Sequence, residues 1–163
     1  MNLEFSVKET VIRHSGVIDE IQYEFEEITT ENVSFGITTK KEKRSRTYDL
    51  HITRTRYNQL TQHIPNALSF DDFILVLRPF MMGFYHHNEL ERAFQILDRN
   101  SSGSIDTNEL AKFVPIINEY ATINTLKNHI RKLNVNIDGH LNYNEFRSLI
   151  LRGIGRELLC THA

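Results

Sequence analysis

Two twelve-residue segments rich in oxygen-bearing side chains, 98–109 and 134–145, constrain this chain of 163 residues more than any other feature. They begin 36 residues apart, and each lies between stretches whose apolar residues recur at helical spacing. A helix–loop–helix that occurs twice in tandem is a supersecondary repeat, and each copy needs a neighbour to cover its apolar face. The pattern therefore predicts two paired helix–loop–helix units in the C-terminal half.

In the first segment, the residues at positions 1, 3, 5, 7, 9 and 12 all offer oxygen atoms to a cation. They are Asp98, Asn100, Ser102, Ser104 through its carbonyl, Asp106 and Glu109. A hard cation such as Ca²⁺ takes about six to eight oxygen ligands, so the chain has to wrap around it. Gly103 at position 6 permits a sharp turn, and Ile105 at position 8 is expected to join the core. The segment predicts a calcium site.

The second segment keeps the same positions with fewer carboxylates. Its candidate ligands are Asn134, Asn136, Asp138, His140 through its carbonyl, Asn142 and Glu145. Two of them are carboxylates, against three in the first segment. Because ligand charge is one determinant of calcium affinity, we expect the second site to bind more weakly.

On these residues the sequence resembles the calmodulin and troponin C superfamily of EF-hand proteins. The resemblance rests on the two loops, on the Leu-Asn-Tyr-Asn-Glu-Phe run at 141–146 and on Phe94, four residues before the first loop. It covers residues 84–153 and continues more faintly into 61–72. That segment keeps an apolar residue at position 8 and an acid at position 12 but lacks the other ligands, so it resembles an EF-hand loop without its ligands.

The family plan implies a fourth unit before residue 61. One register places Thr30 at position 1 and Lys41 at position 12, and a second register is shifted by four residues. Neither supplies the coordinating carboxylates. The N-terminal half is therefore expected to bind no calcium between residues 25 and 72.

The resemblance implies an all-α EF-hand fold of two lobes, each with paired helix–loop–helix units and a short β-bridge between its loops. Helices are expected over 17–28, from apolar residues at helical spacing, and over 49–60. Pro79 and Gly83 predict a kinked or non-helical segment over 78–86. The expected division is an arm (1–16), a degenerate EF-hand pair (17–78), a linker (79–87), a calcium-binding pair (88–153) and a tail (154–163).

Charge is unevenly distributed, although the net charge is −2. Residues 1–31 carry eight acids and two bases, and residues 40–56 carry seven bases and two acids. A basic stretch can attract phosphate or an acidic surface. We favour a solvated loop facing the acidic first helix, because no aromatic residue is interleaved among the basic residues 40–46 for base stacking.

Several functional classes are disfavoured. The sequence shows no nucleophile–base arrangement, phosphate-binding glycine loop or zinc spacing, so no enzymatic activity is expected. The longest apolar run, 73–77, is far shorter than the roughly 20 residues of a membrane span, so no membrane insertion is expected. A single cysteine, Cys160, favours a reducing compartment, which is the cytosol or the nucleus, and we expect a cytoplasmic location.

The resemblance implies a calmodulin-like calcium sensor that binds up to two Ca²⁺ in its C-terminal pair and an amphipathic helix of a target protein. The alternative is a light-chain-like structural subunit held permanently on a helical target, with calcium structural or absent. A calcium buffer is disfavoured, because two or three carboxylates per loop are few for high affinity. The free protein is expected to be monomeric and to bind no nucleic acid.

Overall fold

The computed structural model describes residues 2–119, 121–132 and 139–159. The chain divides into two compact units, Met1–Ile52 and Thr53–Ala163, which we call the sheet unit and the helical unit. Within the described residues, no helix has both the length and the apolar character that crossing a bilayer requires.

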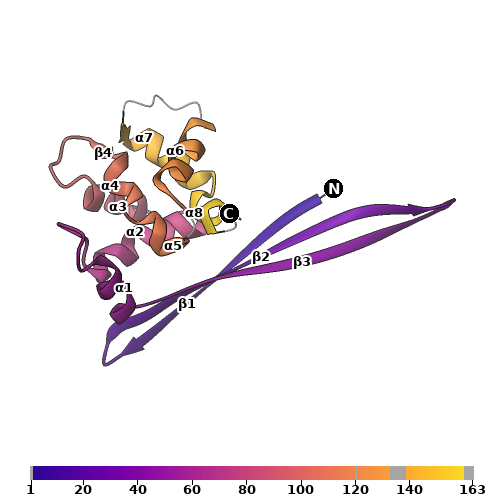
Figure 1. The fold of residues 1–163 in the computed structure, drawn as a ribbon, viewed down its shortest axis with the longest axis horizontal. Coiled ribbons are helices and arrows are strands. Elements are labelled where there is room, and N and C mark those ends of the chain that lie inside the picture. Colours follow the sequence, from indigo (N-terminus) through magenta and orange to yellow (C-terminus); the bar gives the residue numbers. More distant parts are fainter. Residues whose placement is uncertain (1, 120, 133–138, 160–163) are drawn as a thin grey trace. The chain divides into compact units, whose positions relative to one another are not determined.

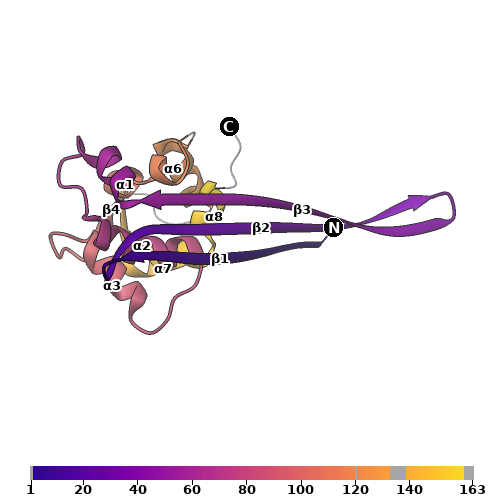
Figure 2. The ribbon, with the colours of Figure 1, turned by 90° about the horizontal axis from the view of Figure 1, so that it is seen from below.

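The sheet unit is a three-stranded sheet in which β2 lies between β1 and β3 (Figures 1 and 2). The strands are β1 (Asn2–His14), β2 (Val17–Phe35) and β3 (Thr38–Thr53). β1 and β2 pair antiparallel from Asn2↔Thr30 to His14↔Val17, with one register shift at Ile12/Arg13. Because β1 pairs no further than Thr30, the last residues of β2 continue as a two-stranded ribbon with β3.

Two-residue turns connect the strands, and their backbone angles explain the residues found there. Ser15 and Gly16 have φ of 52° and 80°, and a type I′ hairpin turn needs positive φ at both positions. Gly36, first in the second turn, has φ of 61°, as a type II′ turn requires.

The prediction of an all-α fold is wrong, because the structure contains a three-stranded sheet as well as the two-stranded β4–β5 pair. Residues 17–28, expected to be a helix, form the first part of β2, and residues 49–53 end β3. The segment does place apolar residues at helical spacing, but Ile21, Tyr23 and Phe25 also alternate with polar residues, and all three are buried. Alternation with period two is the β-strand signal, and pairing with β1 stabilises it. Both expected registers of the first degenerate EF-hand therefore fall within the β2–β3 hairpin.

The helical unit contains three successive helix–loop–helix segments (Figure 1). They are formed by α1 and α2, by α3 and α4, and by α6 and α7. The bounds are α1 (Arg54–Thr61), α2 (Phe70–Met82), α3 (Glu89–Leu97), β4 (Ser104–Asp106), α4 (Thr107–Ala111), α5 (Val114–Ile117), α6 (Ile123–Lys132), β5 (His140–Asn142), α7 (Tyr143–Leu151) and α8 (Ile154–Leu159). Strands β4 and β5 form an antiparallel pair between the second and third loops.

The chain breaks between α2 and α3 at a glycine rather than at a proline. α2 continues through Pro79 and ends at Gly83, whose φ is 75° and whose N–H donates to the Pro79 carbonyl at 3.0 Å. The predicted segment 78–86 is not non-helical throughout, because residues 78–82 belong to α2 and the helix ends only at Gly83. Residues 83–88 are not helical, so there is no continuous helix from Asp72 to Leu97, as predicted. Arg78 of α2 and Glu89 of α3 form an ion pair at 2.7 Å, which holds the two helices within one unit.

The expected C-terminal tail contains a further helix, α8, over residues 154–159. Ile154 and Leu158 are buried, so α8 forms part of the core of the helical unit. Gly155 permits its close approach to α2, because a Cβ added there would overlap the Phe80 carbonyl. Cys160 lies outside the described residues.

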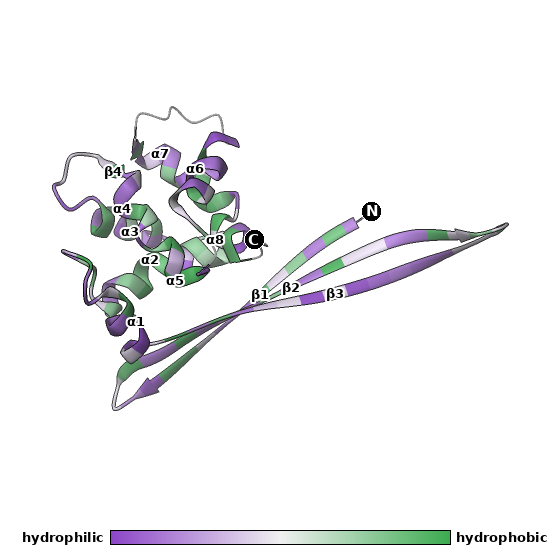
Figure 3. Cartoon of the chain, viewed as in Figure 1, coloured by the Kyte–Doolittle hydropathy of each residue, from purple (hydrophilic) through white to green (hydrophobic). Residues whose placement is uncertain are grey.

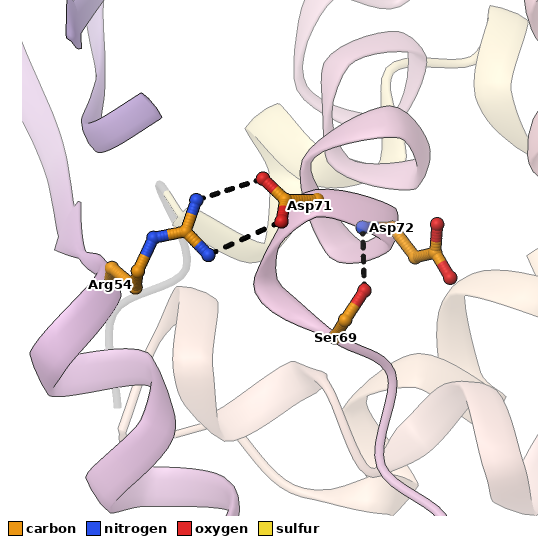
Figure 4. Close-up of polar contacts among 4 residues, drawn as sticks. All are labelled: Arg54, Ser69, Asp71 and Asp72. Carbon is orange, nitrogen blue, oxygen red and sulfur yellow. Dashed lines mark hydrogen bonds and ion pairs between the residues drawn. The ribbon is translucent and has the colours of Figure 1, made fainter. Parts of the chain in front are cut away.

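The first helix–loop–helix, α1–α2, is held by an aromatic cluster and by an ion pair. Tyr57 stacks on Phe73 with ring centroids 4.6 Å apart, and its hydroxyl donates to the Leu68 carbonyl at 2.9 Å. Burial raises the pKa of Tyr57 to about 12, so the hydroxyl remains a donor. Arg54 donates to both carboxylate oxygens of Asp71, at 2.8 and 3.3 Å (Figure 4).

Candidate calcium site

The first predicted loop lies between α3 and α4 and faces one cavity of about 510 Å³. The residues at all six candidate ligand positions line this cavity: Asp98, Asn100, Ser102, Ser104, Asp106 and Glu109. The cavity is also lined by the α1–α2 connection, residues 64–68, and by Lys112, Phe113 and His140. The six residues that the sequence predicts as ligands in the first loop therefore all border one cavity.

Asp98 holds the beginning of the loop in a tight turn. Its two carboxylate oxygens accept from the N–H groups of Ser102 at 3.0 Å and Gly103 at 2.8 Å. The Ser102 hydroxyl donates to the same carboxylate at 3.1 Å. Burial raises the pKa of Asp98, but these hydrogen bonds outweigh it and leave the pKa below its ordinary value. Asp98 is therefore a carboxylate at neutral pH, which is the form that binds a cation.

The second half of the loop is fixed to the core and to the third helix–loop–helix. Ile105 is 1% exposed, as its predicted role at position 8 requires. It pairs with Leu141 across the β4–β5 ladder. Thr107 donates to the Gly139 carbonyl through its N–H at 3.0 Å and its hydroxyl at 3.1 Å. Gly103 has φ of 86°, which explains why glycine stands at position 6.

The two carboxylates at the end of the loop are engaged with the protein itself. Asp106 caps α4, because its Oδ1 accepts from the Asn108 N–H at 2.8 Å. Both oxygens of Glu109 accept from the Lys112 Nζ, at 3.1 and 3.0 Å. Within residues 2–119, 121–132 and 139–159, no three carboxylate, imidazole or thiol groups are gathered closely enough to hold a metal ion.

The donor atoms of the loop and the present partner of Glu109 determine how well the loop can bind calcium. The donor set consists entirely of oxygens, as a hard cation requires, and position 12 carries a carboxylate long enough to bind through both oxygens. Glu109 has to leave Lys112 before it can coordinate an ion. Lys112 was not identified from the sequence as part of the site, although a lysine three residues after a glutamate on a helix is a recognisable ion-pair spacing.

The second predicted loop is described only in part. Asn134, Asn136 and Asp138 lie outside the described residues, whereas His140, Asn142 and Glu145 lie within them. Asn142 and Glu145 form a capping box at the start of α7: the Glu145 N–H donates to Asn142 Oδ1 at 2.8 Å, and the Asn142 N–H donates to Glu145 Oε1 at 2.9 Å. The position-12 carboxylate is therefore engaged in this loop too.

The connection between α1 and α2 lines the same cavity of about 510 Å³ and has a different local structure from the first loop. Ser69 caps α2 by accepting from the Asp72 N–H at 3.1 Å (Figure 4). The Thr61 hydroxyl donates to the Tyr57 carbonyl at 2.8 Å. Thr61, at position 1 of the degenerate loop, is thus the last residue of α1, and Asp72, at position 12, lies in the first turn of α2.

Comparison with known proteins agrees with this geometry. The EF hand family model matches residues 90–114, which include α3, the first loop and α4. The chain is 39% identical over 61 residues to calmodulin-like protein 2 of Arabidopsis thaliana. It is 26% identical over 91 residues to the putative calmodulin-like protein 6 of Oryza sativa, and 29% identical over 81 residues to cell division control protein 31 of Saccharomyces cerevisiae.

Each of these matches covers only part of both proteins. The aligned segments amount to 37%, 52% and 50% of this chain, in the same order. They span 40%, 52% and 50% of the respective relatives, so this chain matches about half of their length or less.

Proposed function

We propose, from the membership of this chain in the EF-hand calcium-binding proteins of the calmodulin superfamily, that its helical unit is a calcium sensor. It binds up to two Ca²⁺, one in the loop 98–109 and a weaker one in 134–145, and then binds an amphipathic helix of a target protein. The observation that supports this proposal is that the residues at all six ligand positions of the first loop line one cavity. The lone cysteine favours a cytoplasmic location for such a sensor.

Glu109 provides the connection between the ion and the core. An ion at the centre of the loop attracts the Glu109 carboxylate away from Lys112. Glu109 lies on α4, where Leu110 directly follows it, and Phe113 lies just before α5. Leu110 and Phe113 line a narrow apolar cavity between α2, α4 and α5, which we call the seam. Movement of α4 therefore displaces the side chains that close this seam.

The seam is closed in the structure described here. Its cavity measures about 10 Å³, no more than the roughly 10–15 Å³ that a single water needs, so no target side chain fits without movement. Phe113 contacts Phe73 with ring centroids 5.7 Å apart, and Phe73 stacks on Tyr57. This series of contacts extends the effect of α4 movement to α2 and α1. Sensor EF-hands open a groove in this way, whereas buffer-type units barely open.

A light-chain-like subunit is the second candidate, and one observation favours it. Glu109 and Glu145 both have protein partners, Lys112 and the N–H of Asn142, so neither carboxylate needs an ion to balance it. A helical unit that is complete without calcium can remain on a target at all calcium concentrations.

Amide NMR of the full chain with and without calcium distinguishes the two candidates. A sensor gives large shifts in α4, α5 and α2, together with new binding of an apolar dye. Calcium binding without dye binding or helix movement supports the constitutive subunit. Shifts spread equally over the sheet unit contradict both, because the sheet unit contributes none of the predicted ligands.

A further inference from the structure

The β2–β3 turn exposes apolar side chains with no cover from the sheet. Ile37 is 105% exposed and Phe35 is 63% exposed, the highest values among the large apolar residues of the described chain. The neighbouring residues 31–35 lie beyond the end of β1, which pairs only as far as Thr30 (Figure 2). We call residues 33–46 the hairpin tip. An exposed phenylalanine and isoleucine at the end of a ribbon mark a contact surface rather than a structural core.

Five cations follow these apolar residues on β3. They are Lys40, Lys41, Lys43, Arg44 and Arg46, and all are exposed. Glu42 is the only acid in the hairpin tip, so its net charge is 5 − 1 = +4. Among the described residues, none of the five side chains forms an ion pair or hydrogen bond. Figure 3 shows this hydrophilic stretch along the outer part of β3.

Apolar and cationic side chains share one face of the ribbon. The Ser45 hydroxyl donates to Glu26 at 3.1 Å, so odd-numbered residues of β3 and even-numbered residues of β2 lie on the same face. At the tip, Phe35 and Thr38 flank a two-residue turn and therefore face each other across the ribbon. Odd-numbered residues of β2 thus share a face with even-numbered residues of β3 there too. The other face therefore carries Val33 and Phe35 together with Lys40, Glu42, Arg44 and Arg46, so three cations and one acid accompany the apolar residues.

We propose that the hairpin tip docks on the surface of an anionic phospholipid bilayer. Phe35 and Ile37 enter the boundary between head groups and acyl chains, and the lysines and arginines bind lipid phosphates. Lys40, three residues from Ile37, lies about 10 Å behind it at 3.3 Å per residue, so it remains at head-group level. The contact is peripheral, with no membrane span, and it is independent of the proposed calcium function.

The distribution of residues favours a membrane over other acidic partners. Binding of single-stranded nucleic acid uses aromatic residues among the cations, and residues 38–46 contain none. An acidic protein surface would satisfy the charges, but it gives no reason for a fully exposed isoleucine at the turn. A lipid surface satisfies both features, because it offers phosphates and an apolar interior within a few ångströms of each other.

The chain has no tryptophan, which provides a direct test. The Ile37→Trp variant of the full chain is mixed with vesicles of 30% phosphatidylserine in phosphatidylcholine, with a chelator present to remove calcium. Tryptophan emission should shift to the blue with these vesicles and remain unchanged with pure phosphatidylcholine. Val17→Trp is the matched control, because Val17 is 49% exposed beside the opposite turn of the same sheet. Its emission should not change.

Vesicle co-sedimentation measures the contribution of charge. Lys40→Gln and Arg44→Gln should each lower the partition coefficient roughly fivefold, since a basic residue near an anionic membrane contributes about 1 kcal/mol. Lys8→Gln, on β1, is the charge-matched control and should change it little. Ile37→Ser leaves the strands intact, as circular dichroism checks, and should also weaken binding.

Three results would overturn the proposal. One is the absence of a blue shift in Ile37→Trp. Another is an equal loss of binding in Lys8→Gln and Lys40→Gln, which would indicate non-specific charge attraction. The third is tighter binding to polyglutamate or single-stranded DNA than to the vesicles, which would assign the hairpin tip to an acidic protein or a nucleic acid.

Discussion

Replacing Lys112 with glutamine should increase the calcium affinity of the loop 98–109. The Lys112 Nζ lies 3.0 Å from Glu109 Oε2, and the ion has to compete with this contact. The side chains are 37% and 55% exposed, and an ion pair at such a surface contributes about 0.2–1 kcal/mol. Removing it should therefore raise calcium affinity by about 1.4- to 5-fold. Loss of a positive charge beside a divalent cation acts in the same direction.

The assay is calorimetric titration of calcium into the full chain. Lys112→Arg is the matched control, because arginine retains the ion pair and should leave the affinity unchanged. Lys127→Gln, which removes the same charge from α6 outside the cavity, should also have little effect. Unchanged or lower affinity in Lys112→Gln would show that Lys112 does not compete with the ion.

Three further predictions concern the helical unit. Gly155→Ala should lower the free energy of unfolding in urea by about 1–3 kcal/mol, because the new Cβ overlaps the Phe80 carbonyl. A decrease of less than about 0.5 kcal/mol would refute the close contact. Burial lowers the pKa of His129, Lys132 lowers it further, and Glu157 at 2.9 Å only partly opposes them. As the pH falls, the histidine in the unfolded chain therefore takes up a proton before the one in the folded chain. The free energy of unfolding should decrease as the pH drops below about 6.5, and His129→Gln should remove this contribution to its pH dependence. Arg54→Gln should raise the pKa of Asp71 towards its ordinary value, because the hydrogen bond from Arg54 lowers that pKa. NMR of the carboxyl group measures the change, and an unchanged pKa would contradict the contact in Figure 4.

The candidate loop was predictable because its positions are determined by local chemistry. Alternating oxygen donors, a glycine at position 6 and an apolar residue at position 8 lie within twelve consecutive residues. The helical spacing of the apolar residues before this loop is confirmed by α3 (Glu89–Leu97). The partner of Glu109 was missed, because the ligand pattern describes the ion-bound arrangement and Lys112 lies beyond its last position.

The sheet unit was not predictable from the family plan, because its structure depends on pairing between distant residues. Residues 17–28 satisfy both a helical period and a two-residue alternation, and only the partner strand β1 decides between them. The turn signals were present in Ser15-Gly16 and Gly36-Ile37, since glycine in a two-residue connection between alternating segments is typical of a hairpin. Expecting an EF-hand in every part of the chain obscured those signals.

The most direct test of the central claim is calcium titration of the full chain and its Glu109→Gln variant by calorimetry, in a physiological concentration of magnesium. The wild type should bind no more than two ions, and Glu109→Gln should lose the tighter of them, because it removes the carboxylate that binds through two oxygens. Glu145→Gln should affect mainly the weaker site. An isotherm that Glu109→Gln leaves unchanged, or a third ion bound between residues 25 and 72, would contradict the account.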